Sequence, residues 1–124
     1  MRLADALGEV MPVRIEDDGA LTVRHDGTVA SLRLVTVAEG LELVSLTAIL
    51  GWDLPLTAEL RERVAAQASR TMLGTVMLSE QPGRRADLVL RYNFPAGDLG
   101  VPALQTLVLM VLAGGGEAAR AVAG

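Results

Sequence analysis

Hydrophobic residues dominate the stretch from Asp98 to Ala113. After Pro102, only Gln105 and Thr106 interrupt its run of Leu, Val, Met and Ala. Proline suits the first turn of a helix, where its missing N–H is no loss, and Gly114-Gly115-Gly116 predicts the end of that helix. A helix with one packed face carries a polar stripe over about half its circumference. This helix scarcely has one, so we expect it to be covered on most sides, by a sheet and by a second subunit.

The first half of the chain alternates between apolar and polar residues, which indicates β-strands. Turn sequences separate the alternating segments, and His25-Asp26-Gly27 is a strong hairpin signal because Asp-Gly stands between two apolar runs. The predicted strands are Val13–Glu16, Ala20–Arg24, Thr28–Val37 and Leu41–Leu50. Both faces of the last one are largely uncharged, which predicts a central strand covered on both sides.

Proline and glycine divide the rest of the chain. Gly51–Leu56 is predicted to be a connection, because Pro55 is unsuited to a central strand. Thr57 is predicted to be the N-cap of a helix that runs to about Met72. The remaining predicted elements are a helix over Leu3–Val10, strands over Thr75–Glu80 and Ala86–Phe94, and a short tail over Glu117–Gly124.

The predicted order is a helix, three hairpin-linked strands with an extra one at Val13–Glu16, a helix, two strands and a helix. Short links between strands favour a mainly antiparallel sheet, and helices that pack on it make the fold α+β. The 124 residues suit one domain, 1–124. With one Trp, one Tyr and one Phe, its core must consist of Leu, Val, Ile, Ala and Met.

Composition and charge exclude several classes of function. The formal net charge is −4, and the eleven basic residues, all arginine, are scattered. Such a chain is a poor candidate for nucleic-acid binding. With no cysteine and a single histidine, we expect no metal site and no cofactor. The usual nucleophile and acid–base sets are missing, which favours a protein without enzymatic activity.

The sequence also allows a prediction of the cellular compartment. The N-terminus has acidic residues where a secretory signal needs an apolar run, and the chain has no cysteine. Both features favour the cytoplasm. The apolar stretch Leu99–Gly116 contains four glycines and lacks closely flanking basic residues, so we expect a core or interface helix rather than a membrane span.

Two sets of apolar residues are candidates for contacts with other proteins. One face of the helix Thr57–Met72 carries residues at i, i+4 spacing, with alanines that permit close approach of another helix. The predicted dimer interface consists of Leu60, Val64, Ala68, Met72, Val76 and Leu78. The predicted partner-binding residues are Leu21, Val23, Val29, Leu41, Leu43 and Trp52. The five strand residues could equally belong to the core or to an intermolecular sheet contact. Trp52, a residue type enriched in interfaces, could instead cap the edge of the core.

The chain also resembles a known fold. Leu88–Pro95, a short loop and Pro102-Ala103-Leu104 are similar to the last strand, loop and helix of the type III secretion chaperone fold. The helix Thr57–Met72 followed by Gly74–Leu78 is similar to the central helix and fourth strand of that fold, which class I secretion chaperones and the YbjN-like family share. The resemblance covers about residues 13 to 120 and rests on element order.

The resemblance implies a homodimer without enzymatic activity that holds an extended segment of a client protein at strand edges and apolar grooves. It does not choose between a secretion chaperone and a YbjN-like regulator. The alternative is a small-molecule-binding or regulatory module, with an aliphatic pocket between helix and sheet.

Overall fold

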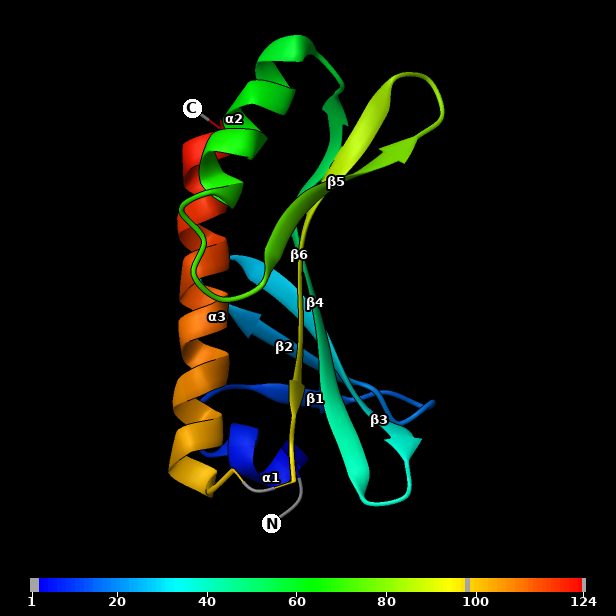
Figure 1. Cartoon of the computed structure of the whole chain (residues 1–124), viewed down its shortest axis with the longest axis vertical. Coiled ribbons are helices and arrows are strands. Elements are labelled where there is room, and N and C mark those ends of the chain that lie inside the picture. Colours follow the sequence, from blue (N-terminus) through cyan, green and yellow to red (C-terminus); the bar gives the residue numbers. More distant parts are fainter. Residues whose placement is uncertain (1–2, 98, 124) are drawn as a thin grey trace.

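Six strands form one antiparallel sheet, and a long helix runs along one of its faces (Figure 1). The computed structural model describes residues 3–97 and 99–123, so Asp98 lies outside the described residues. In chain order the elements are α1 (Leu3–Gly8), β1 (Val13–Ile15), β2 (Leu21–His25), β3 (Thr28–Ala38), β4 (Leu41–Pro55), α2 (Ala58–Ala68), β5 (Thr75–Gln81), β6 (Arg85–Pro95) and α3 (Val101–Ala123). The predicted α+β class and the antiparallel sheet are confirmed.

The strand order is β1-β2-β3-β4-β6-β5, and short turns join the neighbours that are also consecutive in the chain, whereas α2 and β5 lie between β4 and β6 in the sequence. Asp26 and Gly27 both have positive φ, at 51° and 78°, between the paired residues His25 and Thr28. This is the geometry of a type I′ turn, whose twist matches that of the strands it joins. The predicted hairpin is therefore confirmed, and the turn fixes which residues of β2 and β3 face the same side.

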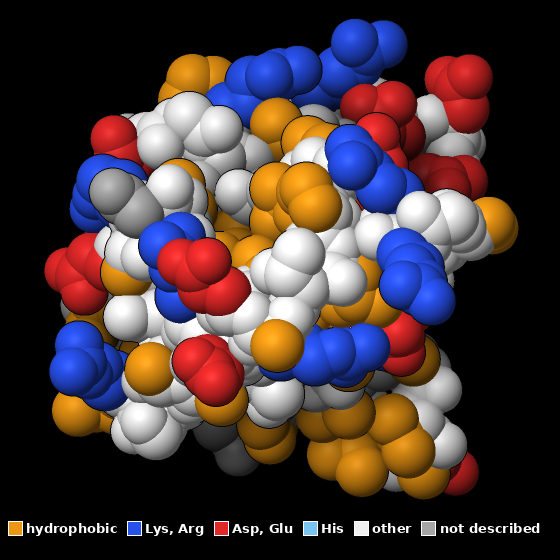
Figure 2. Space-filling view, turned by 90° about the horizontal axis from the view of Figure 1, so that it is seen from above, with side chains coloured by type: hydrophobic (Ala, Val, Ile, Leu, Met, Phe, Trp, Pro, Cys, Tyr) orange, Lys and Arg blue, Asp and Glu red, His pale blue; other side chains and the backbone are white. Residues whose placement is uncertain are grey.

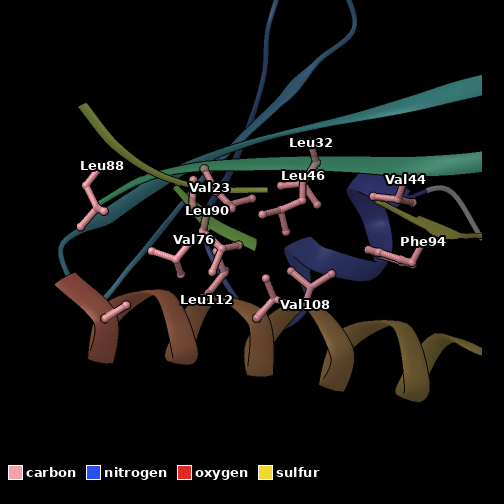
Figure 3. Packing of buried hydrophobic residues seen from close by; sticks show 14 of the residues in the cluster. Val23, Leu32, Val44, Leu46, Val76, Leu88, Leu90, Phe94, Val108 and Leu112 are labelled. Atoms are coloured by element: carbon pink, nitrogen blue, oxygen red, sulfur yellow. The ribbon is translucent and has the colours of Figure 1, made fainter. Parts of the chain in front are cut away.

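The core lies between one face of the sheet and α3. Strand side chains such as Leu32, Leu46 and Leu90 point from the sheet toward Val108 and Leu112 of α3 (Figure 3). All five side chains are fully buried, and burial of such a side chain stabilises the fold by about 1.5–3 kcal/mol. We call the sheet face toward α3 the inner face and the opposite one the outer face.

The outer face has no helix over it among the described residues. Strand β4 is central, between β3 and β6, but its outer residues Leu43, Thr47 and Ile49 are only half-buried. The prediction that this strand is covered on both sides is therefore wrong for the single chain. The half-burial comes from neighbouring side chains on the sheet, because β-strand side chains shield one another across paired strands.

The predicted end of the last helix is wrong, because α3 continues through Gly114-Gly115-Gly116 to Ala123. A Cβ atom at Gly115 would lie 3.1 Å from Cδ2 of Leu50 and 3.8 Å from Cδ1 of Leu90. The missing side chain thus lets the helix approach the sheet closely. Tertiary packing outweighs the low intrinsic helix propensity of glycine here.

By length and composition alone, α3 could also cross a membrane. In this structure it packs on the sheet through Val108, Val111 and Leu112. Met110, on the side away from the sheet, remains 52% exposed. We predicted that this helix would be covered on most of its sides. In the single chain the sheet covers one side, and the side that carries Met110 is exposed.

Two further boundaries differ from the prediction. Strand β4 extends to Pro55, and irregular pairing after Ile49 absorbs the residues that were predicted to be a connection. Pro55 is the last paired residue, so its missing N–H interrupts no continuing ladder. Thr57 is the predicted N-cap and accepts from the Leu60 N–H at 3.1 Å, but α2 ends at Ala68 rather than Met72.

Two glycine substitutions test the course of α3. No heavy atom would lie within 4 Å of a Cβ at Gly114, so Gly114→Ala should raise the free energy of unfolding by about 0.5–1 kcal/mol through helix propensity. Gly115→Leu should lower it by about 1–3 kcal/mol or more, since the side chain would overlap the core. Urea unfolding measures both values. A destabilising Gly114→Ala would contradict a continuous helix.

Candidate partner-binding surface

The structure buries much of the predicted dimer interface inside the single chain. Leu60 and Val64 face the core that α2 forms with α3 and β5, and Val76 of β5 is buried in the same cluster. Leu78 packs against that cluster and is half-buried. Leu60, Val64 and Val76 are therefore not surface residues of this structure, and Leu78 is only partly exposed.

The other two predicted interface residues, Ala68 and Met72, are exposed. Met72 is 88% exposed and lies beyond the end of α2, in the connection to β5. The predicted face of the helix is thus divided: its large residues pack inward, and only its C-terminal end and the following connection reach solvent.

The predicted partner-binding residues also differ in their burial. Leu21 and Val23 belong to the core, as the alternative interpretation had it. Val29 and Leu43 are half-buried, and strand alternation places both on the outer face. Leu41 and Trp52 are exposed, at 43% and 66%, but they lie at opposite ends of β4. The structure does not bring these six residues together into one patch.

A different apolar surface occurs at the free end of the β3–β4 hairpin. Strand β2 pairs with β3 only as far as Leu32, so the second half of β3 is paired with β4 alone among the described residues. We call residues Leu34–Ala38 the β3 edge. Leu34, Val35 and Val37 there are 54%, 42% and 56% exposed. Figure 1 shows this hairpin at the end of the sheet that lies away from α2.

The β3 edge carries little of the protection that proteins usually give to an unpaired strand. Charged residues and proline normally discourage pairing with other chains, and Leu34–Ala38 contains neither. Its one irregularity is a register shift against β4 between Thr36 and Ala38. Backbone N–H and C=O groups along this side are therefore free to pair with another strand.

A groove of about 590 Å³ lies on the inner face beside the β3 edge. It runs between the hairpin, the N-terminal residues and the start of α3. We call it the hairpin groove, and the residues that line it are Leu3, Leu34, Gly40, Glu42, Val44, Ala96, Gly97, Leu99, Val101 and Leu104. Among the described residues that line it, Glu42 is the only charged one, and the other side chains there suit an apolar side chain.

The sequence pattern did not point to the β3 edge. Alternation in Thr28–Val37 predicted a strand but not which strand would pair with each part of it. The signal that could have found it is the mismatch in length, since the predicted strand Ala20–Arg24 is only half as long as its neighbour. A longer strand paired with a shorter one must leave part of its edge unpaired.

A second feature stands at the other end of β4, where Asp53 has a φ of 50°. The Arg85 Nε donates to Asp53 Oδ1 at 3.0 Å, and Arg85 Nη2 donates to the Asp53 carbonyl oxygen at 2.6 Å. The Asp53 N–H donates to Asp87 Oδ1 at 2.9 Å. These contacts hold a left-handed residue in place beside the exposed Trp52.

Charge attraction also acts in this cluster. Hydrogen bonding from Arg85, with its positive charge second, holds the pKa of the Asp53 carboxyl below its ordinary value. The same hydrogen bond raises the pKa of Arg85. The cluster is therefore an exposed ion pair beside the irregular pairing of β4.

A smaller pocket of about 280 Å³ lies at the same end of the molecule, between β4, the start of α2 and the end of α3. Leu54, Leu60, Leu88 and Val122 line it, together with Arg63. Arg63 already donates to Glu59 at 2.6 Å and to the Val122 carbonyl oxygen at 3.3 Å. Figure 2 looks onto this end and shows hydrophobic side chains at its centre, with arginine and acidic side chains around them.

The part of the chain that the structure describes contains no group of three or more His, Asp or Glu side chains that could hold a metal ion. His25, the single histidine, is half-buried at the end of β2, beside the β2–β3 turn. The candidate surfaces consist of apolar side chains and of the unpaired backbone groups of the β3 edge.

Comparison with known proteins places the fold. No protein-family model matches the chain, and no characterised protein matches it by sequence. Among solved structures, the chain resembles YbjN from E. coli, a proposed transcription regulator, with a TM-score of 0.66. The match covers 94% of this chain and 85% of that one at 13% sequence identity. The chain therefore has a YbjN-like fold, which confirms that part of the resemblance.

Removing the charge of Asp53 tests the ion pair at the bulge. Asn tolerates positive φ, so Asp53→Asn keeps the backbone and loses the charge. Because the folded-state pKa of Asp53 is lowered, the pair stabilises the fold above the ordinary carboxyl pKa and loses that effect as the pH falls through the folded value. The variant should melt below the wild type at pH 7, and the gap should close below about pH 4.

Glu62→Gln, on the exposed surface of α2, is the control for a general loss of negative charge. A gap between wild type and Asp53→Asn that stays constant from pH 7 to pH 3 would contradict the role of this ion pair.

Proposed function

We propose that this protein is a non-enzymatic protein-binding module, a chaperone or adaptor that holds an extended segment of a partner polypeptide along the β3 edge. The observation that carries the proposal is the unpaired, uncharged strand segment Leu34–Ala38 with its exposed apolar side chains. An extended segment laid there adds a strand to the sheet, and its main-chain hydrogen bonds supply affinity without any particular sequence.

The hairpin groove supports selectivity for the added segment. Successive side chains of a strand point to opposite faces, so every second residue of a bound segment would point toward the groove beside Leu34 and Leu99. The intervening residues would lie beside Val35 and Val37. Glu39 and Glu42 stand near the turn of the hairpin and favour a basic residue at that end of the segment.

The mild negative charge supports a role through protein contacts. YbjN is a proposed transcription regulator, but the present chain has a net charge of −4 and no basic stripe. If this chain takes part in regulation, we propose that it acts on a protein partner in the cytoplasm and not on nucleic acid or a membrane.

A small-molecule-binding module is the second candidate, and the pocket between β4, α2 and α3 favours it. Its walls are aliphatic, at Leu54, Leu60 and Leu88. The nearest charged donor, Arg63, is engaged by Glu59 and by the Val122 carbonyl, so few polar groups are left to orient a ligand. We therefore rank this function below protein binding.

Selection from a library of random twelve-residue peptides tests the proposal, because it needs no known partner. The wild-type chain should enrich peptides with alternating apolar residues and a basic end. Leu34→Lys should abolish that enrichment, because it puts a charge both on the edge and at the groove.

The matched control is Ile15→Lys, which changes a residue that is 66% exposed on the edge strand β1. It should select the same peptides as the wild type. Enrichment that survives Leu34→Lys, or no enrichment by the wild type, would contradict binding at the β3 edge.

A further inference from the structure

We infer that the outer face of the sheet is a docking surface for an acidic segment of a partner protein. This inference goes beyond the proposed function, because it concerns another surface and does not depend on strand addition at the β3 edge. Figure 1 shows α2 and α3 on the opposite side of the sheet, and among the described residues no helix covers the outer face. The side chains of this face are therefore open to a partner.

Strand alternation brings four arginines, which are scattered along the sequence, to the outer face. Successive side chains of a strand point to opposite faces, so a residue next to a buried inner-face residue points outward. Arg24, Arg33 and Arg91 each follow a buried valine or leucine of the core. Arg14 is paired with Thr22, which lies beside the same buried valine as Arg24. We call these four exposed residues the outer arginines.

Three neighbouring rows of paired residues cross this face. The middle row spans all six strands and consists of Arg14, Thr22, Ser31, Thr47, Arg91 and Thr75. The row on one side consists of Arg24, Val29, Ile49, Val89 and Met77. The row on the other side consists of Arg33, Ser45 and Asn93. These rows hold every outer arginine and no acidic residue, so the face is basic although the chain has a net charge of −4.

Two of the outer arginines are available to a partner. Arg14 and Arg33 form ion pairs with acidic residues of the segment between β1 and β2. Arg24 and Arg91 take part in no ion pair among the described residues. The neighbours of Arg91 in the middle row are both threonines, whose hydroxyl groups donate hydrogen bonds. A carboxylate at this point would meet an unengaged guanidinium with hydroxyl donors beside it.

The spacing of Arg24 and Arg91 indicates the length of the segment that would contact both. They lie on β2 and β6, with β3 and β4 between them, and neighbouring strands are about 4.8 Å apart. A separation of roughly 15 Å corresponds to about five residues of extended chain. A guanidinium binds a carboxylate through two parallel N–H donors. Val29 and Ile49, half-buried between the two arginines, would contact an apolar residue between the carboxylates.

Acidic residues next to the outer arginines favour a short acidic peptide over a nucleic acid. Glu16, Asp17 and Asp18 lie between β1 and β2, beside the ion-paired arginines. A long polyphosphate would pass these carboxylates and the rest of a surface with net negative charge, which repels it. A peptide of a few residues contacts the centre of the face alone, where charge complementarity gives specificity.

Fluorescence anisotropy of labelled twelve-residue peptides with the full chain tests the inference. One peptide is rich in Glu and Leu, and its counterpart has Gln in place of every Glu. The wild type should bind the Glu peptide in a titration to about 500 μM, a range suited to a weak contact. The Gln peptide should bind at least about fivefold more weakly. Binding of the Glu peptide should weaken as salt rises from about 50 mM to about 500 mM, because salt screens exposed charges.

Charge reversal of the two available arginines locates the contact. The double variant Arg24→Glu with Arg91→Glu should bind the Glu peptide at least about tenfold more weakly, since two attractive contacts become repulsive. Arg70→Glu with Arg84→Glu is the matched control, which changes the net charge equally and should bind like the wild type. Arg70 and Arg84 are exposed, lie between α2 and β5 and in the β5–β6 turn, and take part in no described ion pair. Thermal unfolding shows whether each variant folds.

An equal loss of binding in the two double variants would be a response to net charge alone and would overturn the inference. A wild type that binds the Glu peptide no better than the Gln peptide overturns it as well. So does a labelled single-stranded oligonucleotide that binds the wild type more tightly than the Glu peptide does. Leu34→Lys, which changes the β3 edge, should leave binding of the Glu peptide intact, so this titration and the peptide selection above fail independently.

Discussion

The close approach of α3 to the sheet is the constraint on which the rest of this structure depends. Gly115 permits it, because a side chain there would meet Leu50 and Leu90. Val108, Val111 and Leu112 then close the inner face of the sheet and complete the core. Since this one helix covers a single face, the outer face and the far end of the hairpin are left without cover among the described residues. The β3 edge is exposed because helical cover is confined to one face of the sheet.

Local signals predicted the elements of this fold well, since short-range chemistry decides them. The Asp26-Gly27 turn, the Thr57 cap and the alternation in the strands specify their own neighbourhoods. The boundaries that differed were decided by tertiary contacts. Gly114-Gly115-Gly116 has the composition of a helix end, yet the sheet that it packs against holds it helical. Pro55 ends a strand that the pattern had ended at Leu50, because β6 continues to pair with it.

The surface was harder to predict than the fold, because an apolar residue has the same appearance in a sequence whether it is buried or exposed. Leu21 and Leu60 were candidates for contacts and belong to the core. Leu34 and Val37 had the pattern of ordinary strand residues. They are exposed because β3 extends beyond the end of its neighbour β2. Exposure at an edge depends on the length of the paired strand, which is a property of the whole sheet. The YbjN-like fold supplies the sheet, and the β3 edge of this chain has no charged residue between Arg33 and Glu39.

Amide hydrogen exchange, measured residue by residue at low protein concentration, tests the central claim that part of β3 is an open edge. Alternate amides between Leu34 and Ala38 should exchange at least about a hundredfold faster than those of Leu46 and Leu90 in the middle of the sheet. Uniform slow exchange across Leu34–Ala38 in the dilute chain would mean that the edge is already covered, and it would contradict the account.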